Sequence, residues 1–321
     1  MLNTVAALVD ADTRECSIST IQDRAEWETL FARAPFPHLP QSWMYGEGKR
    51  AEWTVDRLII HSPRGPLGLA QVLNRQVLGF PVARINRGPL FLAAHPSPET
   101  RAAVLRTLRR HWRFLRRGLL LIAPALPAGE ESARELRAAG FLKRAEFAWG
   151  SSLLNLAPPV EEIFTHLTPE WRRHVRKAER NGVRIEVRTD ADSFEWLLAR
   201  HAENMRAKNF VGPSPEFVRR MLAASPDDVS LVRAIIDGEP HAAALVARFG
   251  RHAEYYIGWF DDVARRAAAG NLLMWNAVTL MKAAGCDALD LGGFSVTDRY
   301  GQFKRGMRGD EYRLAGEWLA F

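Results

Sequence analysis

The chain has 321 residues, 47% of them hydrophobic, which is enough for two hydrophobic cores. Its formal net charge of +7 indicates an anionic partner, such as nucleic acid, nucleotide phosphates or a membrane surface, without choosing among them. Two cysteines, Cys16 and Cys286, exclude a disulfide framework, and no spacing of Cys or His predicts a metal site. The start of the sequence does not resemble a signal peptide and the longest apolar run, 119–126, is too short to span a bilayer, so we expect a cytoplasmic protein.

The first half of the sequence predicts a three-stranded meander framed by helices and followed by two further strands. Hydrophobic periodicity and turn residues define these elements. In chain order we expect a strand at 15–20, helices at 24–34 and 42–50, strands at 54–61, 67–78 and 82–86, a helix at 98–117, a strand at 118–125, a helix at 130–139 and a strand at 141–156.

The second half predicts the same order of elements. Thr168 followed by Pro169 is a strong helix start, and Asn181-Gly182 is a typical helix end. In chain order we expect a helix at 169–180, a strand at 183–188, helices at 192–208 and 214–224, strands at 229–236, 241–249 and 253–260, a helix at 267–284, a strand at 288–291, an irregular loop and a last strand.

The two halves are predicted to be copies of one domain. Their meanders align with Pro66 over Pro240, Ala70 over Ala244 and Val72 over Val246. The repeated order predicts an α/β (α+β) fold of two tandem domains, each a mixed sheet flanked by helices, without an inserted helical arm. We place the domains at 1–156 and 157–309, and expect residues 310–321 to form a final strand that could return to the first domain.

Lysine is rare in this chain, with six lysines beside 38 arginines. A lysine kept in such a composition marks a position that could require a compact ammonium rather than a planar guanidinium. Lys304 is one of them, and it follows a loop at the carboxyl end of the apolar strand 288–291, where binding sites tend to collect.

Seven segments, in the right order along nearly the whole chain, resemble FemABX-type aminoacyltransferases, which use the element order of GNAT acyltransferases. In the first half they are Gln41-Ser42-Trp43 with Lys49, GLAQVL at 68–73 and NRGP at 86–89. In the second half they are WRRHVRKAERNGVRI at 171–185, EYYIGWF at 254–260, LLMWNAV at 272–278, and LDLGG at 289–293 followed by FKRGM at 303–307. The resemblance implies two tandem GNAT-like domains.

Members of this family transfer an amino acid from aminoacyl-tRNA to an amine, often on a peptidoglycan precursor. The resemblance therefore implies an aminoacyltransferase that forms a peptide bond, with aminoacyl-tRNA as co-substrate and no other cofactor. It implies an amine-bearing acceptor, possible forms being a nucleotide-linked peptidoglycan precursor and, as an alternative, a small peptide or natural product; the acceptor and the transferred amino acid are left open. We also expect a monomer without stable membrane insertion.

The resemblance assigns Phe303 and Lys304 to the functional Phe-Lys pair of the family. Amide formation from an aminoacyl ester needs a cation or hydrogen-bond donors for the tetrahedral oxyanion, and a lysine suits that task. Lys304 could equally anchor the terminal phosphates of the tRNA. The alternative is a surface lysine beside a core phenylalanine.

Four further residues are candidates for substrate binding. Lys49, in the segment of Trp43, matches the lysine that binds the acceptor diphosphate in the family; the alternative is a cation at a helix end. Tyr255 and Tyr256 lie on a strand that borders the acyl-donor cleft in GNAT folds, and strand alternation leads us to choose Tyr256 for the cleft. Arg206 is a weaker candidate for holding an acceptor phosphate.

Two basic helices are candidates for contact with RNA. Arg172, Arg176, Lys177 and Arg180 lie on the helix 169–180, and such a row suits the phosphates of an RNA backbone. The segment 100–118 has seven arginines and no acidic residue, and could contact tRNA or an anionic lipid head group. In both cases the alternative is a solvated helix face.

Other readings have weaker support. A GNAT-type acyl-CoA-dependent N-acyltransferase is the main alternative, but its pyrophosphate loop needs Arg/Gln-x-x-Gly-x-Gly/Ala, and the segment 266–271 has one glycine at the wrong spacing. A binding module without activity is a third reading. No general base is evident: Asp298 is in the right loop, but loop aspartates usually form turns. Hydrolase, NTPase and dehydrogenase motifs are absent from the sequence.

Overall fold

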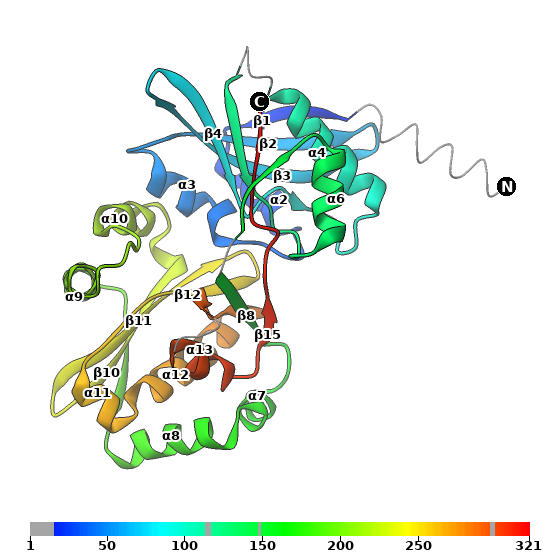
Figure 1. Cartoon of the computed structure of the whole chain (residues 1–321). Helices are drawn as coiled ribbons and strands as arrows, with labels where there is room; N and C mark the ends of the chain where they lie inside the picture. Colours follow the sequence, from blue (N-terminus) through cyan, green and yellow to red (C-terminus); the bar gives the residue numbers. More distant parts are fainter. Residues whose placement is uncertain (1–15, 113–116, 147–148, 296–298) are drawn as a thin grey trace. The chain divides into compact units, whose positions relative to one another are not determined.

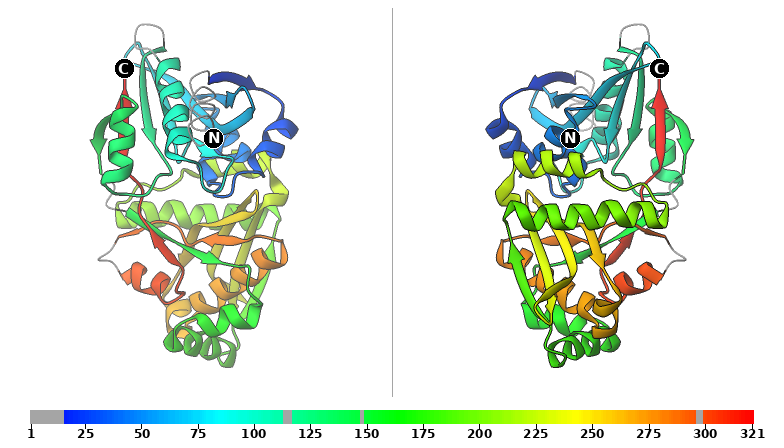
Figure 2. Two further views of the ribbon diagram at one scale, coloured as in Figure 1. Left: turned by 90° about the vertical axis from the view of Figure 1, so that its right-hand side faces the viewer. Right: turned by 90° about the vertical axis from the view of Figure 1, so that its left-hand side faces the viewer.

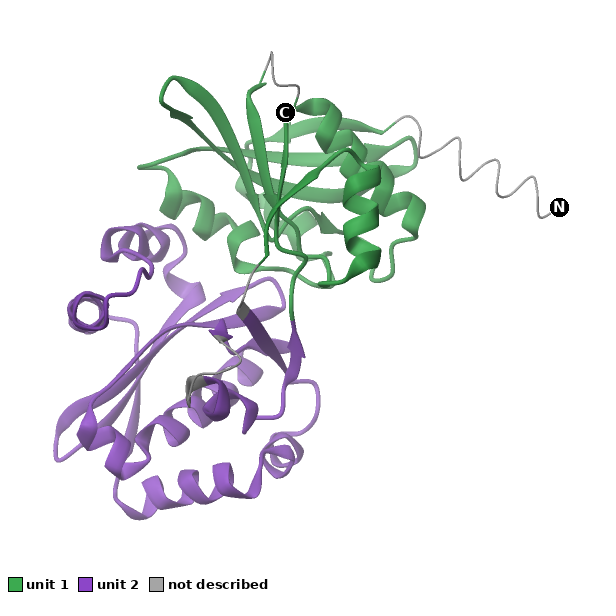
Figure 3. Ribbon diagram, viewed as in Figure 1, with its two compact units in different colours: residues 1–147, 313–321 green, residues 148–312 purple. Residues whose placement is uncertain are grey.

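The computed structural model describes residues 16–112, 117–146, 149–295 and 299–321. It divides the chain into two units, unit 1 with residues 1–147 and 313–321, and unit 2 with residues 148–312 (Figure 3). The division differs from the expected boundary at 156, because residues 149–156 belong to unit 2. None of the helices in these described ranges is both long and apolar enough to cross a membrane.

Unit 1 is a mixed sheet with helices on it. Its elements are β1 (Ser17–Ile21), α2 (Arg24–Phe31), η1 (Leu39–Gln41), α3 (Trp43–Lys49), β2 (Thr54–Ser62), β3 (Gly65–Val77), β4 (Phe80–Asn86), β5 (Leu90–Phe91), α4 (Pro98–His111), β6 (Leu119–Ala123), α6 (Glu130–Ala138), β7 (Leu142–Ala145) and β16 (Glu317–Ala320). The strands pair in the order β1-β2-β3-β4-β6-β16-β7, with β5 beside β3 (Figure 1). Helix α4, expected to reach 117, ends at His111.

Helices α4 and α6 bury the apolar side of their periodic pattern against this sheet. Ser97 accepts a hydrogen bond from the backbone N–H of Thr100, and Pro98 fits the first helical position, so these two residues start α4. Leu105 and Leu108 of α4 are fully buried in one core with Trp318 of β16. The arginines of α4 therefore occupy its other sides.

Unit 2 has the same architecture. Its elements are β8 (Trp149–Asn155), α7 (Val160–His166), α8 (Pro169–Arg180), β9 (Arg184–Arg188), α9 (Ala191–Lys208), α10 (Pro215–Ala224), η2 (Pro226–Asp228), β10 (Val229–Ile236), β11 (Glu239–Phe249), β12 (His252–Phe260), α11 (Asp262–Ala267), α12 (Ala269–Ala283), β13 (Ala288–Asp290), β14 (Phe294–Ser295), α13 (Arg299–Arg305) and β15 (Asp310–Tyr312). The strands pair in the order β14-β8-β13-β12-β11-β10-β9, with β15 beside β8. Helix α9 crosses one face of this sheet (Figure 2), and α12 with α8 covers the other.

The two units share details that confirm the duplicated fold. In both, the hairpin register shifts at the same place: Pro66 pairs with His61 while Gly68 pairs with Ile60, and Pro240 pairs with Ile235 while Ala242 pairs with Ala234. In both, the third meander strand is parallel to the strand after the long helix, β4 with β6 and β12 with β13. The mixed sheets, flanked by helices, are those expected of tandem GNAT-like domains.

Each sheet receives one strand from the other half of the sequence. Strand β8 follows unit 1 in the chain but pairs with β13, β14 and β15 in unit 2. Strand β16, at the end of the second half, pairs with β6 and β7 in unit 1. The single strand expected at 141–156 is therefore two strands, β7 and β8, that lie in different sheets. Element order alone cannot reveal such an exchange.

Candidate functional site

The carboxyl end of β13 forms a buried polar corner in unit 2. Asp290 is 4% exposed and accepts hydrogen bonds from the hydroxyls of Ser151 and Tyr312 and from the backbone N–H of Gly292 at 2.8 Å. These donors compensate the desolvation of the carboxylate. Asp290 therefore fixes the turn in which the chain leaves the sheet.

Lys304 points at this turn. The residue lies on α13, not at the end of the irregular loop that we expected, and it is 4% exposed. Its Nζ donates to the carbonyl oxygens of Gly292 at 2.9 Å and Gly293 at 3.1 Å. The ring centroids of Tyr255 and Phe294 lie 5.6 and 5.9 Å from Nζ, within the range of a cation–π contact. Lys304 is thus a buried ammonium, not a surface lysine.

Phe303 borders a cavity next to that ammonium. Its ring centroid lies 5.7 Å from that of Trp171, and its carbonyl accepts a hydrogen bond from Trp171 Nε1 at 3.1 Å. The cavity has a volume of about 180 Å³ and a mostly apolar lining, formed by Tyr255, Phe260, Ala264, Arg265, Ala268, Gly270, Asn271, Leu273, Met274 and Phe303. Small-molecule sites in proteins commonly combine such a lining with a few polar groups.

Tyr255, not Tyr256, lies beside Lys304. The register of β11 and β12 shifts so that Leu245 pairs with Ile257 while Val246 pairs with Tyr255, which leaves Tyr256 in a bulge. Tyr255 belongs to the buried cluster under α12, whereas the ring centroid of Tyr256 lies 6.5 Å from that of Phe217 on α10. Tyr255, which alternation places in the core, is buried and also lines this cavity, whereas Tyr256, chosen for the cleft, is not in its lining.

A His–Asp pair lies near one end of the cavity. His241 Nδ1 is 2.7 Å from Asp261 Oδ2, and Asp261 follows Phe260, which lines the cavity. Burial acts to raise the pKa of Asp261, but hydrogen bonds from the backbone of Ala264 and from His241 outweigh burial and hold this pKa below its usual value. The carboxylate therefore stays charged and orients the imidazole. Asp298, the loop aspartate that we considered, lies outside the described residues.

The close packing at Gly292 gives a direct test of this geometry. Gly292 has φ +74°, and a Cβ there would lie 2.8 Å from the Tyr255 carbonyl oxygen and 3.4 Å from Lys304 Nζ. Gly182 has φ +70° with open space around it. We expect Gly182→Ala to lower the free energy of unfolding by about 1–2 kcal/mol and Gly292→Ala by at least about 1 kcal/mol more, because a steric clash adds to the backbone strain. Urea unfolding measures both, and equal losses would contradict the geometry.

The proposed RNA-binding residues lie along α8. Arg176, Lys177 and Arg180 are exposed, as an RNA contact requires. Arg172 is half-buried and donates to the Thr165 carbonyl oxygen. The basic row thus retains three exposed cations.

Arg206 is exposed near the end of α9, on the opposite face of the sheet from α12, and the structure does not bring it to the Lys304 corner.

In unit 1, the three segments that carry the family resemblance meet in one hydrogen-bonded cluster. The side chain of Gln41 is fully buried; its Nε2 donates to the Asn86 carbonyl oxygen at 2.7 Å and its Oε1 accepts from the Gln71 backbone N–H at 2.7 Å. Gln71 Nε2 in turn donates to the carbonyl oxygens of Pro40 and Ser42 at 3.1 and 2.9 Å. A Cβ at Gly88 would lie 2.7 Å from the Gln41 side chain, so this close approach requires glycine.

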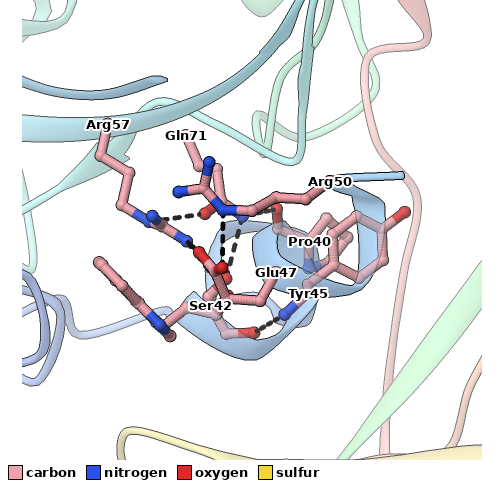
Figure 4. Close-up of polar contacts among 8 residues, drawn as sticks. Pro40, Ser42, Tyr45, Glu47, Arg50, Arg57 and Gln71 are labelled. Carbon is pink, nitrogen blue, oxygen red and sulfur yellow. Dashed lines mark hydrogen bonds and ion pairs between the residues drawn. The ribbon is translucent and has the colours of Figure 1, made fainter. Parts of the chain in front are cut away.

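A buried arginine anchors α3 to the sheet (Figure 4). Arg57 is 2% exposed and donates to Gln71 Oε1 at 3.0 Å, the Trp43 carbonyl oxygen at 3.2 Å and Glu47 Oε1 at 2.9 Å. Its guanidinium carbon lies 3.5 Å from the centroid of the Trp43 ring. Burial acts to raise the pKa of Glu47, but hydrogen bonds from Arg50 and Arg57 outweigh burial and hold this pKa below its usual value.

Trp43 and Lys49 are the first and last residues of this anchored helix. Lys49 is half-buried, with Nζ 5.8 Å from the ring centroid of Tyr45. The cluster thus holds both candidate acceptor contacts on one rigid element. Arg57 was not among the residues that the sequence singled out; its signal there is a charge inside the mostly apolar strand 54–62. Among the described residues, no group of three or more His, Cys, Asp or Glu could hold a metal ion.

Comparisons with known proteins find a domain family in the second half of the chain and similar structures over nearly its whole length. Residues 169–305 match a family model described as an acetyltransferase (GNAT) domain. The structure is similar to that of FemX, with a TM-score of 0.79 and 15% identity over 94% of this chain and 96% of that one. It is also similar to a tandem GNAT protein from the clavulanic acid biosynthesis pathway, with a TM-score of 0.55 and 14% identity over 95% and 98% of the two chains. A conserved protein of unknown function from Bacteroides thetaiotaomicron gives a TM-score of 0.62 and 11% identity over 94% and 98%.

No curated protein matches the sequence. Identities this low establish the fold alone, and that fold is the tandem GNAT arrangement of FemX, as the sequence motifs implied. The family match over 169–305 adds that unit 2 contains a GNAT-type acyltransferase domain.

Proposed function

We propose that this tandem GNAT-fold acyltransferase, similar in fold to FemX, moves an aminoacyl group from aminoacyl-tRNA to an amine and forms a peptide bond. The acceptor is a peptidoglycan precursor or a small peptide, nucleotide-linked or free. The protein acts as a monomer in the cytoplasm, with no cofactor besides the charged tRNA.

The observation that carries the proposal is the buried ammonium of Lys304. Its two hydrogen bonds to Gly292 and Gly293 fix the Lys304 Nζ in a buried corner, beside the Tyr255 ring that lines the cavity with Phe303. A fixed cation in such a place stabilises the oxyanion of a tetrahedral intermediate more strongly than it would in water. Phe303, with the Trp171 ring behind it, forms one wall for the transferred group.

The other candidate residues take binding roles in this proposal. Exposed Arg176, Lys177 and Arg180 on α8 contact the tRNA backbone, where phosphate contacts supply affinity without reading sequence. Lys49 and Trp43, at the two ends of α3, contact the acceptor, and Arg57 positions their helix.

A second candidate function uses the same cavity with another donor. Ala268, Gly270 and Asn271 line the cavity at the start of α12, the place where a GNAT domain would hold the pyrophosphate of coenzyme A. Ala268 has φ +60° and the segment has a single glycine, so its backbone departs from the expected phosphate loop. This reading predicts acyl-CoA as donor.

One experiment separates the two donors. The protein is incubated with bulk tRNA charged with labelled amino acids, or with labelled acetyl-CoA, together with a cell extract as the source of acceptors. We expect label from tRNA in small amine-containing products, and we expect RNase to abolish that transfer. Transfer from acetyl-CoA that survives RNase would replace the proposal by the second candidate.

A further inference from the structure

One end of the unit 1 sheet carries exposed apolar side chains. Strands β3 and β4 form a hairpin whose last pair is Val77 with Phe80, so Leu78 and Gly79 form a two-residue turn that projects from the sheet (Figure 1). The side chain of Leu78 is 95% exposed and that of Phe80 is 63% exposed. Large apolar groups gathered at an exposed tip indicate an interaction site.

The backbone conformation of the turn is unusual for a leucine. Both central residues have positive φ, +51° at Leu78 and +80° at Gly79. Two-residue turns of this kind favour Asn-Gly, and a leucine in the left-handed region is disfavoured. Because Leu78 is almost fully exposed, burial in the core does not offset that cost. A role outside the folded unit accounts for a leucine at this position.

Arginines gather at the same end of the sheet. Val82 of β4 pairs with Leu119 of β6 in a parallel pair, so exposed Arg117, two residues before Leu119, lies level with Phe80 of the hairpin tip. The carboxyl end of α4 lies at the same end of the sheet. There a cavity of about 380 Å³ has no carboxylate in its lining, which consists of Ala103, Arg106, Arg109, Arg110, Ala138, Ala139 and Gly140. Arg109 is fixed by hydrogen bonds to the main-chain oxygens of Gly140, Trp112 and Phe321, whereas Arg106 and Arg110 are exposed, with Arg110 donating to the hydroxyl of Thr107.

We propose that this end of unit 1, the hairpin tip Val77–Phe80 together with Arg106 and Arg110 of α4 and with Arg117, docks on the surface of an anionic phospholipid bilayer. The apolar side chains enter the boundary below the head groups, and Arg106, Arg110 and Arg117 meet the lipid phosphates. An RNA partner would use the arginines and could stack a base on Phe80, but it would gain little from the aliphatic side chain of Leu78, so the apolar tip favours a membrane. This inference does not depend on the transfer reaction.

Vesicle co-sedimentation of the full chain tests the proposal. We expect binding to vesicles of equimolar phosphatidylglycerol and phosphatidylcholine, and much weaker binding to phosphatidylcholine alone. The double variant Leu78→Asn, Phe80→Ser should lower the partition coefficient at least about tenfold, because two large apolar side chains no longer enter the bilayer. Asn suits the left-handed turn position, so the hairpin should fold. The matched control is Val211→Asn, which removes a fully exposed apolar side chain from unit 2 and should have no effect.

A second variant tests the contribution of the arginines. Arg106→Ala with Arg110→Ala should weaken binding to the anionic vesicles several-fold, and added salt should reduce the difference. Absence of wild-type binding to anionic vesicles would overturn the proposal, as would equal binding of wild type and the hairpin variant. Binding to uncharged tRNA that needs the two arginines but not the hairpin, without vesicle binding, would assign this face to RNA instead.

Discussion

Replacing Lys304 by methionine is expected to lower the rate constant of aminoacyl transfer about 10²- to 10³-fold, with little change in the affinity for tRNA. Methionine keeps most of the volume of the lysine side chain but removes the charge, so the oxyanion loses its electrostatic partner. Losses of this size are typical when one preorganised oxyanion contact is deleted. Single-turnover transfer from charged tRNA measures the rate constant, and a tRNA-binding assay measures the affinity.

Loss of fold could mimic this result, because the methionine also leaves two carbonyl oxygens without their lysine donor. Lys282 provides the matched control. Its Nζ also donates to two backbone carbonyl oxygens, of Leu156 at 2.7 Å and of Ala157 at 3.4 Å, but these follow β8 and do not belong to the turn at Gly292 and Gly293. Lys282 is half-buried, so Lys282→Met should destabilise unit 2 less than Lys304→Met does, and it should keep its activity. A Lys304→Met variant that remains folded and fully active would remove Lys304 from the mechanism, and one that loses tRNA affinity instead would make it the anchor of the tRNA end.

The fold was predictable because two signals in the sequence agreed. Alternation and turn residues located the meanders, and the repeat showed that one arrangement is built twice, down to the register shift beside Pro66 and Pro240. A return of residues 310–321 to the first domain was expected, and β16 pairs there, but the place of β8 in the second sheet was not predictable, since its pattern is one that either sheet would accept. The pairing partner of a strand depends on the three-dimensional course of the chain, which a local pattern does not record.

For the candidate site, only the residues to which the family resemblance gave a role could be predicted. The Phe303-Lys304 pair and its neighbours Tyr255 and Asp290 all stand in segments that carry the family resemblance, but the resemblance implies a function only for the pair, and the strands of Tyr255 and Asp290 read as ordinary core. Alternation placed Tyr255 in the core, where it is buried, but the pattern of one strand could not show that this tyrosine also lines the cavity beside Lys304. The short helix α13 was expected as a loop, since GQFKR between glycines has no apolar periodicity.

Replacing Arg57 by methionine is expected to lower the free energy of unfolding of unit 1 by about 3 kcal/mol. The change leaves Glu47 without one of its two arginines and leaves Gln71 Oε1 and the Trp43 carbonyl oxygen without donors in a buried cluster. The stacking of the guanidinium on Trp43 is lost as well. Urea unfolding gives the free energy, and hydrogen exchange shows whether the loss is confined to unit 1.

The neighbouring Arg50 serves as a control because it bonds the same carboxylate from the surface. Arg50 Nε is 2.6 Å from Glu47 Oε2, and its side chain is 43% exposed. Arg50→Met should therefore cost less than about 1 kcal/mol. Adding Glu47→Gln to Arg57→Met should recover part of the loss, because no partly buried charge then lacks its partner. Equal effects of the two arginine variants would mean that burial of Arg57 contributes nothing to the free energy of unfolding.

If the cluster does anchor α3, Arg57→Met should also weaken acceptor binding through Lys49 and Trp43 while leaving the affinity for tRNA unchanged.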